Sequence, residues 1–152
     1  MSSREGAVRT MLASWQFWAV LSAAFAALTA IFAKIGITGV GSDFATFIRT
    51  VVILVTIAFI LTVTGQWQPF GSVSSKSYAF LVLSGLATGA SWLCYFRALH
   101  LGDAARVAPV DKLSVVLVAL FGVAFLGENL SWRNWLGVLL IASGAVLVAM
   151  RA

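Results

Sequence analysis

The sequence predicts an all-α protein, a polytopic membrane helix bundle of about five transmembrane helices in a single domain that spans residues 1–152. Hydrophobic residues make up 61% of the chain and charged residues only 10%, with a mean hydropathy of +1.02, whereas soluble domains are about 25% charged. Apolar stretches of about twenty residues, long enough to cross a bilayer core of ~30 Å, recur between short polar segments. The chain has room for about five such crossings and little else.

Turn-forming residues and charges bound each predicted helix. The first ends before a cluster of glycines at positions 36, 39 and 41, and the loop after the second contains Pro69. A tight turn over residues 100–103 separates the third from the fourth, and Ser131 is a suitable N-cap for the fifth. The predicted spans are residues 15–34, 43–64, 77–99, 105–127 and 132–150.

The start of the chain has some features of a signal peptide, because Arg4 and Arg9 precede an apolar stretch. The uncharged run from Met11 to Ala33 is longer than the core of a signal peptide, however, and further spans follow it. We therefore interpret it as an uncleaved first span.

Alternating the five spans predicts an aromatic belt at the end of the bundle that carries the N-terminus. Five of the six tryptophans map to that end: Trp15, Trp18, Trp67, Trp132 and Trp135. The lysines and arginines near the span ends are almost evenly divided between the two ends. Because their asymmetry sets orientation, this balance predicts that the chain can insert both ways round.

Asp111 and Lys112 are predicted to lie inside the membrane. The uncharged run from Leu113 to Gly127 makes only ~22 Å of helix, so the fourth span must begin earlier, near Arg106 or Ala108. Charges at that depth are costly and usually mark a functional site, although a buried ion pair that fixes helix register is the alternative. Neighbouring helical residues point about 100° apart, so each of the two is expected to need its own partner.

The third span offers partners and a possible cavity wall. Folding it against the fourth places Asp111 level with Ser91 and Trp92, with Arg97 within reach, and Lys34 or Arg49 are further candidate partners. The hydroxyl-bearing residues Ser84, Thr88, Ser91 and Tyr95 follow helical spacing, as a polar cavity wall would. Gly85 and Gly89 form a GxxxG pair, which is typical of close helix packing.

Other function classes lack support in the sequence. No metal-ligand spacing, catalytic triad or phosphate-binding glycine loop occurs, so we expect no enzyme activity, cofactor or metal. There is no basic run or aromatic platform for nucleic acid. Cys94 is the only cysteine, so no intrachain disulfide forms, and we interpret it as a small core residue. His100 is interpreted as interfacial and Glu128 as a solvated loop carboxylate.

The chain resembles the EamA domain, the unit of the drug/metabolite transporter superfamily. The resemblance rests on APVDKLSVVLVALFGVAFLGE, on Trp132 followed by GVLLIASGAVLV, and on FAKIGITGVGSDFATFIRT, and it covers residues 15–150. It implies a five-helix unit, half of an inverted-repeat transporter, with the substrate site near the midplane between repeats. Small multidrug resistance transporters of the same superfamily pair antiparallel and use a glutamate in their first helix. The first span here has no acidic residue, so their mechanism is not expected.

We therefore expect a transporter subunit that moves a small polar or charged metabolite or drug across a bacterial-type cytoplasmic (inner) membrane by alternating access. It would work as a homodimer, with antiparallel copies, or with a second EamA-type subunit. The rival hypothesis is a non-transporting accessory or assembly subunit of a larger complex. The expected substrate-binding or coupling residues are Asp111, Lys112, Arg97, Trp92, Tyr95, Ser91, Lys34 and Arg49.

Overall fold

The protein forms five helical spans, as the sequence predicts. The computed structural model describes residues 14–150, and five of its helical segments are long and apolar enough to cross a membrane. In chain order the elements are α2 (Trp15–Gly36), α3 (Ser42–Thr64), the short 3₁₀ helix η1 (Phe70–Ser72), α4 (Ser75–Leu101), α5 (Ala104–Asp111), α6 (Ser114–Leu126) and α7 (Trp132–Ala149). Arg4, Arg9 and Met11, on which the interpretation of the start of the chain rests, lie outside the described residues, as does Arg151.

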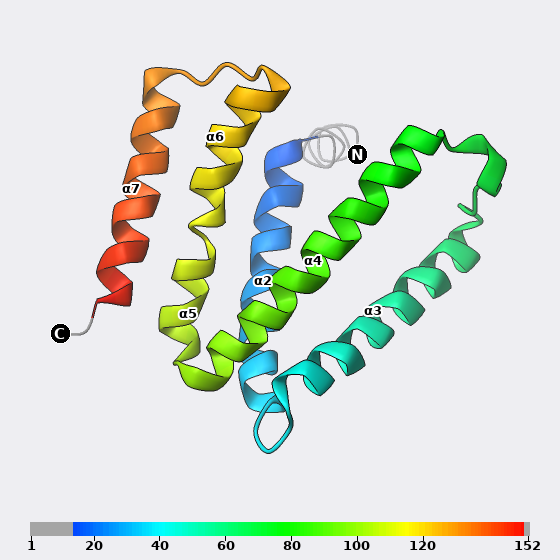
Figure 1. Ribbon diagram of the computed structural model, residues 1–152, viewed down its shortest axis with the longest axis horizontal. Coiled ribbons are helices and arrows are strands. Elements are labelled where there is room, and N and C mark those ends of the chain that lie inside the picture. The colour runs from blue at the N-terminus through cyan, green and yellow to red at the C-terminus, as the bar shows by residue number, and fades with distance from the viewer. Residues whose placement is uncertain (1–13, 151–152) are drawn as a thin grey trace, which may run out of the picture.

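The spans alternate in direction (Figure 1). The start of α2, the α3–α4 loop and the α6–α7 loop lie at one end of the bundle, and the α2–α3 and α4–α5 turns lie at the other. The five tryptophans of the predicted belt are therefore at the first end. Four of them, Trp15, Trp18, Trp67 and Trp132, are more than half exposed, as residues at a membrane interface should be.

Local sequence explains where the helices end. Gly65 (φ 64°) and Gly127 (φ 68°) adopt the left-handed conformation that terminates α3 and α6, a conformation that favours glycine. The Oγ atom of Ser131 accepts a hydrogen bond from the backbone N–H of Asn134 at 3.3 Å, which confirms the predicted N-cap of α7. Ser74 caps α4 in the same way.

The fourth span differs from the single continuous helix predicted over residues 105–127. It consists of α5 and α6, separated by a tightened turn at Lys112 and Leu113. Around this turn the backbone forms i→i+3 hydrogen bonds, such as Leu113 N–H to Val110 O at 3.0 Å and Val116 N–H to Leu113 O at 3.0 Å. Pro109, which lacks an N–H, removes a helical donor just before the turn. A 3₁₀-like interruption of this kind is typical of a hinge or of a functional position.

The packed core is small and lies at the end of the bundle opposite the tryptophan belt. It consists of Ile37, Phe96 and Leu99, each less than 5% exposed. Lys34 reinforces this core, because its Nζ atom donates to the carbonyl oxygens of Leu99 at 2.6 Å and Gly102 at 2.8 Å. The core joins α2 to the C-terminal part of α4, and the α3–α4 hairpin extends away from the other helices above it (Figure 1).

Two predictions about packing, the close helix contact at the GxxxG pair and the core position of Cys94, do not hold within the single chain. A Cβ atom added at Gly85 or Gly89 would have no neighbour within 4 Å, so none of the other helices within residues 14–150 approaches this glycine pair. Cys94 is exposed, and its interpretation as a core residue is wrong for the single chain. Both observations follow from the openness of the α3–α4 hairpin, which leaves much of α4 uncovered.

Candidate functional site

A cavity of about 610 Å³ lies between α2, α4 and α5, and α3 contributes Arg49 to it. This volume is within the range of ~300–1,000 Å³ of small-molecule sites. Its lining comprises Ala19, Ser22, Ala23, Ala26, Ala27, Thr29, Ala30, Arg49, Ser91, Trp92, Tyr95, Ala108, Pro109, Asp111 and Lys112. Six of the eight predicted site residues are therefore gathered in one place.

The polar lining residues lie at a common depth in the bundle. Arg49 is seven residues from the start of α3, Trp92 nine from the end of α4, and Asp111 seven from the start of α5, which is ~10–14 Å of helix in each case. These three helix ends lie at the same end of the bundle (Figure 1). The cavity therefore lies within the predicted membrane thickness of ~30 Å rather than at its surface.

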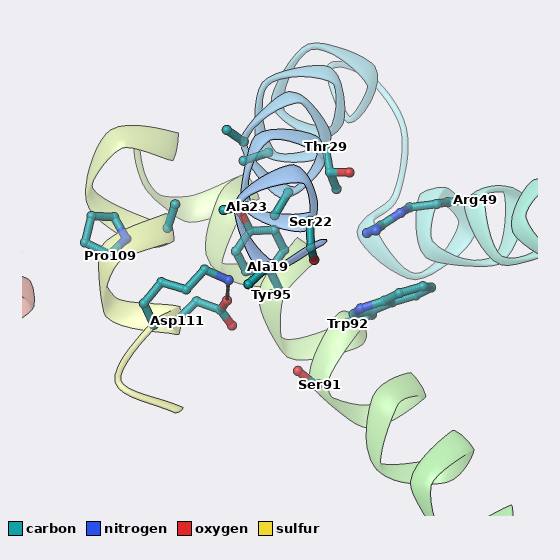
Figure 2. A pocket seen from close by; sticks show the side chains of 15 residues that line it. Ala19, Ser22, Ala23, Thr29, Arg49, Ser91, Trp92, Tyr95, Pro109 and Asp111 are labelled. Carbon is teal, nitrogen blue, oxygen red and sulfur yellow. Dashed lines mark hydrogen bonds and ion pairs between the residues drawn. The ribbon is translucent and has the colours of Figure 1, made fainter. Parts of the chain in front are cut away.

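Arg49 and Trp92 form one side of the cavity. The guanidinium carbon of Arg49 is 4.1 Å from the centre of the Trp92 ring and 5.5 Å from that of Phe96, and Figure 2 shows the arginine reaching over the tryptophan. A cation–π contact contributes about 0.5–2 kcal/mol. Placing an arginine at the centre of a spanning helix costs about 2.5–3.5 kcal/mol. Stacking alone therefore does not offset the burial of this charge.

Asp111 and Lys112 form the opposite side. The Nζ atom of Lys112 is 3.2 Å from the Oδ2 atom of Asp111, so the expectation that each needs a separate partner is wrong. The helix is interrupted at Lys112, and the long lysine side chain folds back onto its neighbour. The pair is only half-buried, because the lysine side chain is 57% exposed and the aspartate 35%. The carboxylate is neutralised within the protomer but remains open to the cavity.

Tyr95 lies between these two sides in the view of Figure 2. Ser91 and Tyr95 line the cavity, as the hydroxyl stripe predicts. Ser84 and Thr88 do not line it, and the Thr88 hydroxyl instead donates to the Ser84 backbone carbonyl at 2.8 Å. Such a bond satisfies the hydroxyl within its own helix, as serine and threonine commonly do.

The wall formed by α2 was missed in the sequence analysis. Small side chains at Ala19, Ser22, Ala23, Ala26 and Ala30 line the cavity and recur at helical spacing. This periodicity of alanine and serine in an otherwise bulky span could have been found in the sequence, because small residues leave room beside a helix.

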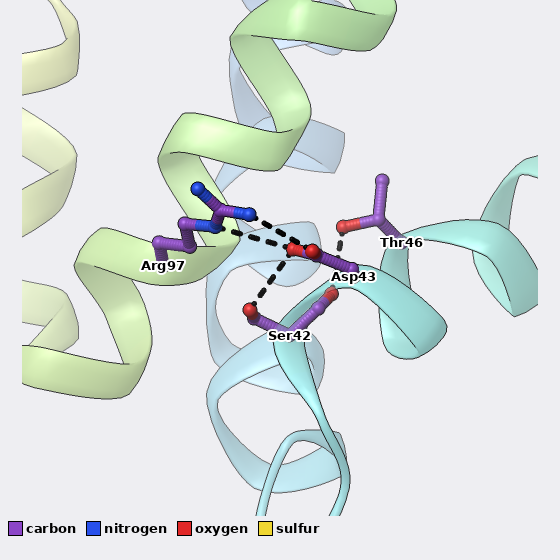
Figure 3. Close-up of polar contacts among 4 residues, drawn as sticks. All are labelled: Ser42, Asp43, Thr46 and Arg97. Carbon is purple, nitrogen blue, oxygen red and sulfur yellow. Dashed lines mark hydrogen bonds and ion pairs between the residues drawn. The ribbon is translucent and has the colours of Figure 1, made fainter.

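Arg97 does not contact Asp111, which corrects one predicted pairing. It instead forms a two-point ion pair with Asp43 of α3, from Nη2 to Oδ2 at 2.9 Å and from Nε to Oδ1 at 3.2 Å (Figure 3). Both side chains are more than half exposed. The pair joins α3 to α4 outside the cavity, and a carboxylate in the first turn of α3 is also favoured by the helix dipole.

Lys34 is likewise outside the cavity lining. Its two bonds to carbonyl oxygens at the C-terminal end of α4 place a cation where the helix dipole favours one. The predicted pairings of Lys34 and Arg49 with Asp111 are both absent among the described contacts, since Arg49 stacks on Trp92 instead.

The register of the α3–α4 hairpin explains the observed pairings. Counted from the helix ends at Thr64 and Ser75, Asp43 and Arg97 are 21 and 22 residues from the loop. Arg49 and Trp92 are 15 and 17 residues from it. In an antiparallel hairpin such positions lie level, so this count could have identified both pairs from the sequence.

The charges of the cavity do not cancel. Arg49 and Lys112 are cationic and Asp111 is anionic, so the lining carries a net charge of +1. Among residues 14–150, no group of three histidine, cysteine, aspartate or glutamate side chains could hold a metal ion. The arrangement is suited to binding a small polar molecule between a stacked guanidinium and a half-buried ion pair.

Comparisons with known proteins agree with this picture. The model of the EamA-like transporter family matches residues 13–150. A protein of Sinorhizobium sp., named an uncharacterized transporter in the cobO 3′ region, is 67% identical over 140 residues, which cover 92% of this chain and 99% of that protein. No solved structure matches the chain. The five apolar spans and the family match together identify an integral membrane protein of the transporter class, and the chain belongs to the EamA-like transporter family.

Proposed function

We propose that the protein is one half of a transporter that moves a small polar or charged metabolite across the cytoplasmic membrane by alternating access, and that two antiparallel copies form the working unit. The observation that carries this proposal is the cavity of about 610 Å³ with Arg49, Asp111 and Lys112 on its wall. Placing an ionisable side chain inside the membrane costs free energy, and such residues usually face a water-filled cavity or a substrate pathway.

The exposed surface of the protomer supports a second subunit. The chain has 12,001 Å² of accessible surface, whereas a compact monomer of 16.1 kDa exposes about 7,400 Å². Fifteen residues expose at most about 2,400 Å², and deducting this upper limit for the residues outside the described range still leaves an excess of about 2,200 Å². A standard-sized protein–protein interface buries about 800 Å² on each partner, so the excess on one chain leaves ample surface for contact with a second chain.

Two further features favour an inverted second copy of the same chain. The relative from Sinorhizobium sp. is matched over 99% of its length, so that protein consists of a single unit of this kind. The sequence predicts nearly balanced cations at the two ends. Arg4, Arg9, Lys76 and Arg133 are assigned to one end and Lys34, Arg49, Arg97, Arg106, Lys112 and Arg151 to the other, where several lie inside helices and so influence orientation only weakly. Such a balance favours insertion in both orientations.

Counterflow in proteoliposomes tests the transport proposal. The purified protein is reconstituted, the vesicles are loaded in turn with members of a panel of neutral, cationic and anionic metabolites, and exchange with external radiolabelled compound is measured. We expect exchange of one chemical class and its loss in Asp111→Asn, with Arg133→Gln as the control because Arg133 lies in the first turn of α7, away from the cavity. Absence of exchange with every class would instead favour an accessory subunit.

Topology reporters test the antiparallel arrangement. A reporter active on only one side of the membrane is fused after Ala152, and signals from both sides are expected. Adding three lysines to the α3–α4 loop should then force one orientation and abolish transport, while a second chain with lysines in the α2–α3 turn should restore it. A one-sided signal from the unmodified chain contradicts a dual-topology homodimer.

A further inference from the structure

The one cation of the cavity that lacks an oxygen acceptor is Arg49. Two of the other cations pair with carboxylates: Lys112 contacts Asp111 and Arg97 contacts Asp43. Two others donate to backbone carbonyl oxygens, Lys34 at the C-terminal end of α4 and Arg106 at the end of α7. Arg49 contacts two aromatic rings, and no hydrogen bond or ion pair joins it to any oxygen atom of residues 14–150. The remaining described cations, Lys76 and Arg133, lie in the first turn of their helices, at the belt end.

The stacking of Arg49 leaves its hydrogen-bonding groups available. Trp92 covers a face of the guanidinium plane at 4.1 Å, whereas the N–H donors of a guanidinium project from its edges. Figure 2 shows the nitrogen-bearing end of Arg49 directed towards the cavity, on the side where Ser22 and Thr29 of α2 lie. A stacked, planar guanidinium is the arrangement that binds a carboxylate through two parallel hydrogen bonds.

From these contacts we propose that the cavity binds its substrate through an anionic group, a carboxylate held by Arg49, with the rest of the molecule against the small apolar side chains of α2. This inference rests on the proposed transport function and names the chemical class of its substrate. The net charge of +1 in the cavity favours an anion, and a second inverted copy would raise this charge to +2.

The same geometry disfavours a cationic substrate. The aromatic face of Trp92 that could stack on a ligand cation is occupied by Arg49. The one carboxylate in the cavity lining is paired with Lys112 at 3.2 Å. A cation would have to displace one of these two side chains and would then lie beside the other positive charge, whereas an anion would complete the contacts of Arg49.

Matched ligands test the inference with the full-length protein in detergent. Benzoate, benzamide and benzylamine have the same ring and differ in charge. Each represents a small panel of compounds that carry its end group, which is a carboxylate, an amide or an amine. Ligand affinity is measured from the dependence of the melting temperature on ligand concentration, since binding stabilises the folded state by mass action. We expect stabilisation by carboxylates only.

Variants identify the binding group. Arg49→Gln should lower carboxylate affinity by at least about tenfold, because a charge-assisted bidentate pair is lost, and Arg49→Lys should restore part of it. The matched control is Arg133→Gln, because Arg133 also lies near a tryptophan, 5.9 Å from the Trp132 ring centre, but at the start of α7. Carboxylate affinity should be unchanged in this variant.

A second measurement does not depend on finding the natural substrate and covers the case in which Arg49→Gln fails to fold. In a variant that keeps Trp92 and carries phenylalanine in place of the other tryptophans, iodide should quench the fluorescence more than caesium does. Iodide quenching should be reduced by added benzoate. Preferential quenching by caesium, or carboxylate binding that survives in a folded Arg49→Gln variant, overturns the inference.

The transport proposal can survive that failure. If benzylamine or benzamide stabilises the protein and exchanges in proteoliposomes while carboxylates do neither, the anion inference is wrong and the transporter stands. If no class binds or exchanges, both are wrong.

Discussion

Replacing Lys34 by methionine should destabilise the protein by about 3 kcal/mol, because the two charge-assisted hydrogen bonds to the end of α4 are lost. The Nζ atom of Lys34 lies 2.6 Å from the carbonyl oxygen of Leu99 and 2.8 Å from that of Gly102. A hydrogen bond that involves a charged group contributes about 1.5–3 kcal/mol. Since both bonds share one ammonium group, we take the upper part of the range for a single bond rather than the sum. A loss of this size lowers the folded-to-unfolded ratio by about a hundredfold.

The neighbourhood makes this loss hard to recover. Leu99 is fully buried, and the core of Ile37 and Phe96 packs beside it, so water has limited access to the carbonyl that lysine would leave. Methionine retains most of the apolar length of lysine, so the variant removes the ammonium group with little change in packing. Lys34→Arg keeps the charge and should lose less than half as much stability.

Unfolding by sodium dodecyl sulfate in mixed micelles, followed by far-ultraviolet circular dichroism, measures the change. Arg133→Gln is the control for removal of a cation from a span end. Ligand affinity, measured on the folded protein, should be unchanged in Lys34→Met because Lys34 does not line the cavity. The reasoning is refuted if Lys34→Met unfolds at the same dodecyl sulfate fraction as the wild-type protein, or if the folded variant binds ligand more weakly.

Four further outcomes are expected from single substitutions. Leu99→Ala should lower the free energy of unfolding by about 2–5 kcal/mol in the same titration, because it opens a cavity at a fully buried large side chain. Gly127→Ala should cost about 1–2 kcal/mol, purely from the left-handed backbone at φ 68°, since no atom lies within 4 Å of the added Cβ; an unchanged midpoint would show that α6 can end differently. Trp92→Ala should weaken ligand binding in detergent without dissociating the proposed dimer, which size-exclusion chromatography with light scattering checks, and normal binding by a less stable variant would make Trp92 a packing residue. Asp111→Cys, made in a Cys94→Ser background, should react with a water-soluble maleimide and be protected by ligand, whereas quenching of an attached probe by labelled acyl chains would place it in lipid.

The number of spans and their boundaries could be predicted from the sequence because both depend on local composition. A run of about twenty apolar residues spans a bilayer whatever it packs against, and Ser131 and Gly127 end their helices through bonds and dihedral angles of their own neighbours. The prediction that Asp111 and Lys112 lie inside the membrane rests on the length of the fourth span, and six of the eight predicted site residues line one cavity.

Which side chains meet was decided by tertiary structure. The pairing of Arg97 with Asp43, the stacking of Arg49 on Trp92 and the capping of α4 by Lys34 depend on how helices rotate and slide against one another. Composition does not specify rotation about a helix axis, and a turn of 100° per residue carries a side chain from a cavity to lipid within one position. The contact between Asp111 and Lys112 lies where the fourth span is interrupted, and a helical periodicity cannot represent that interruption because it assumes an unbroken helix.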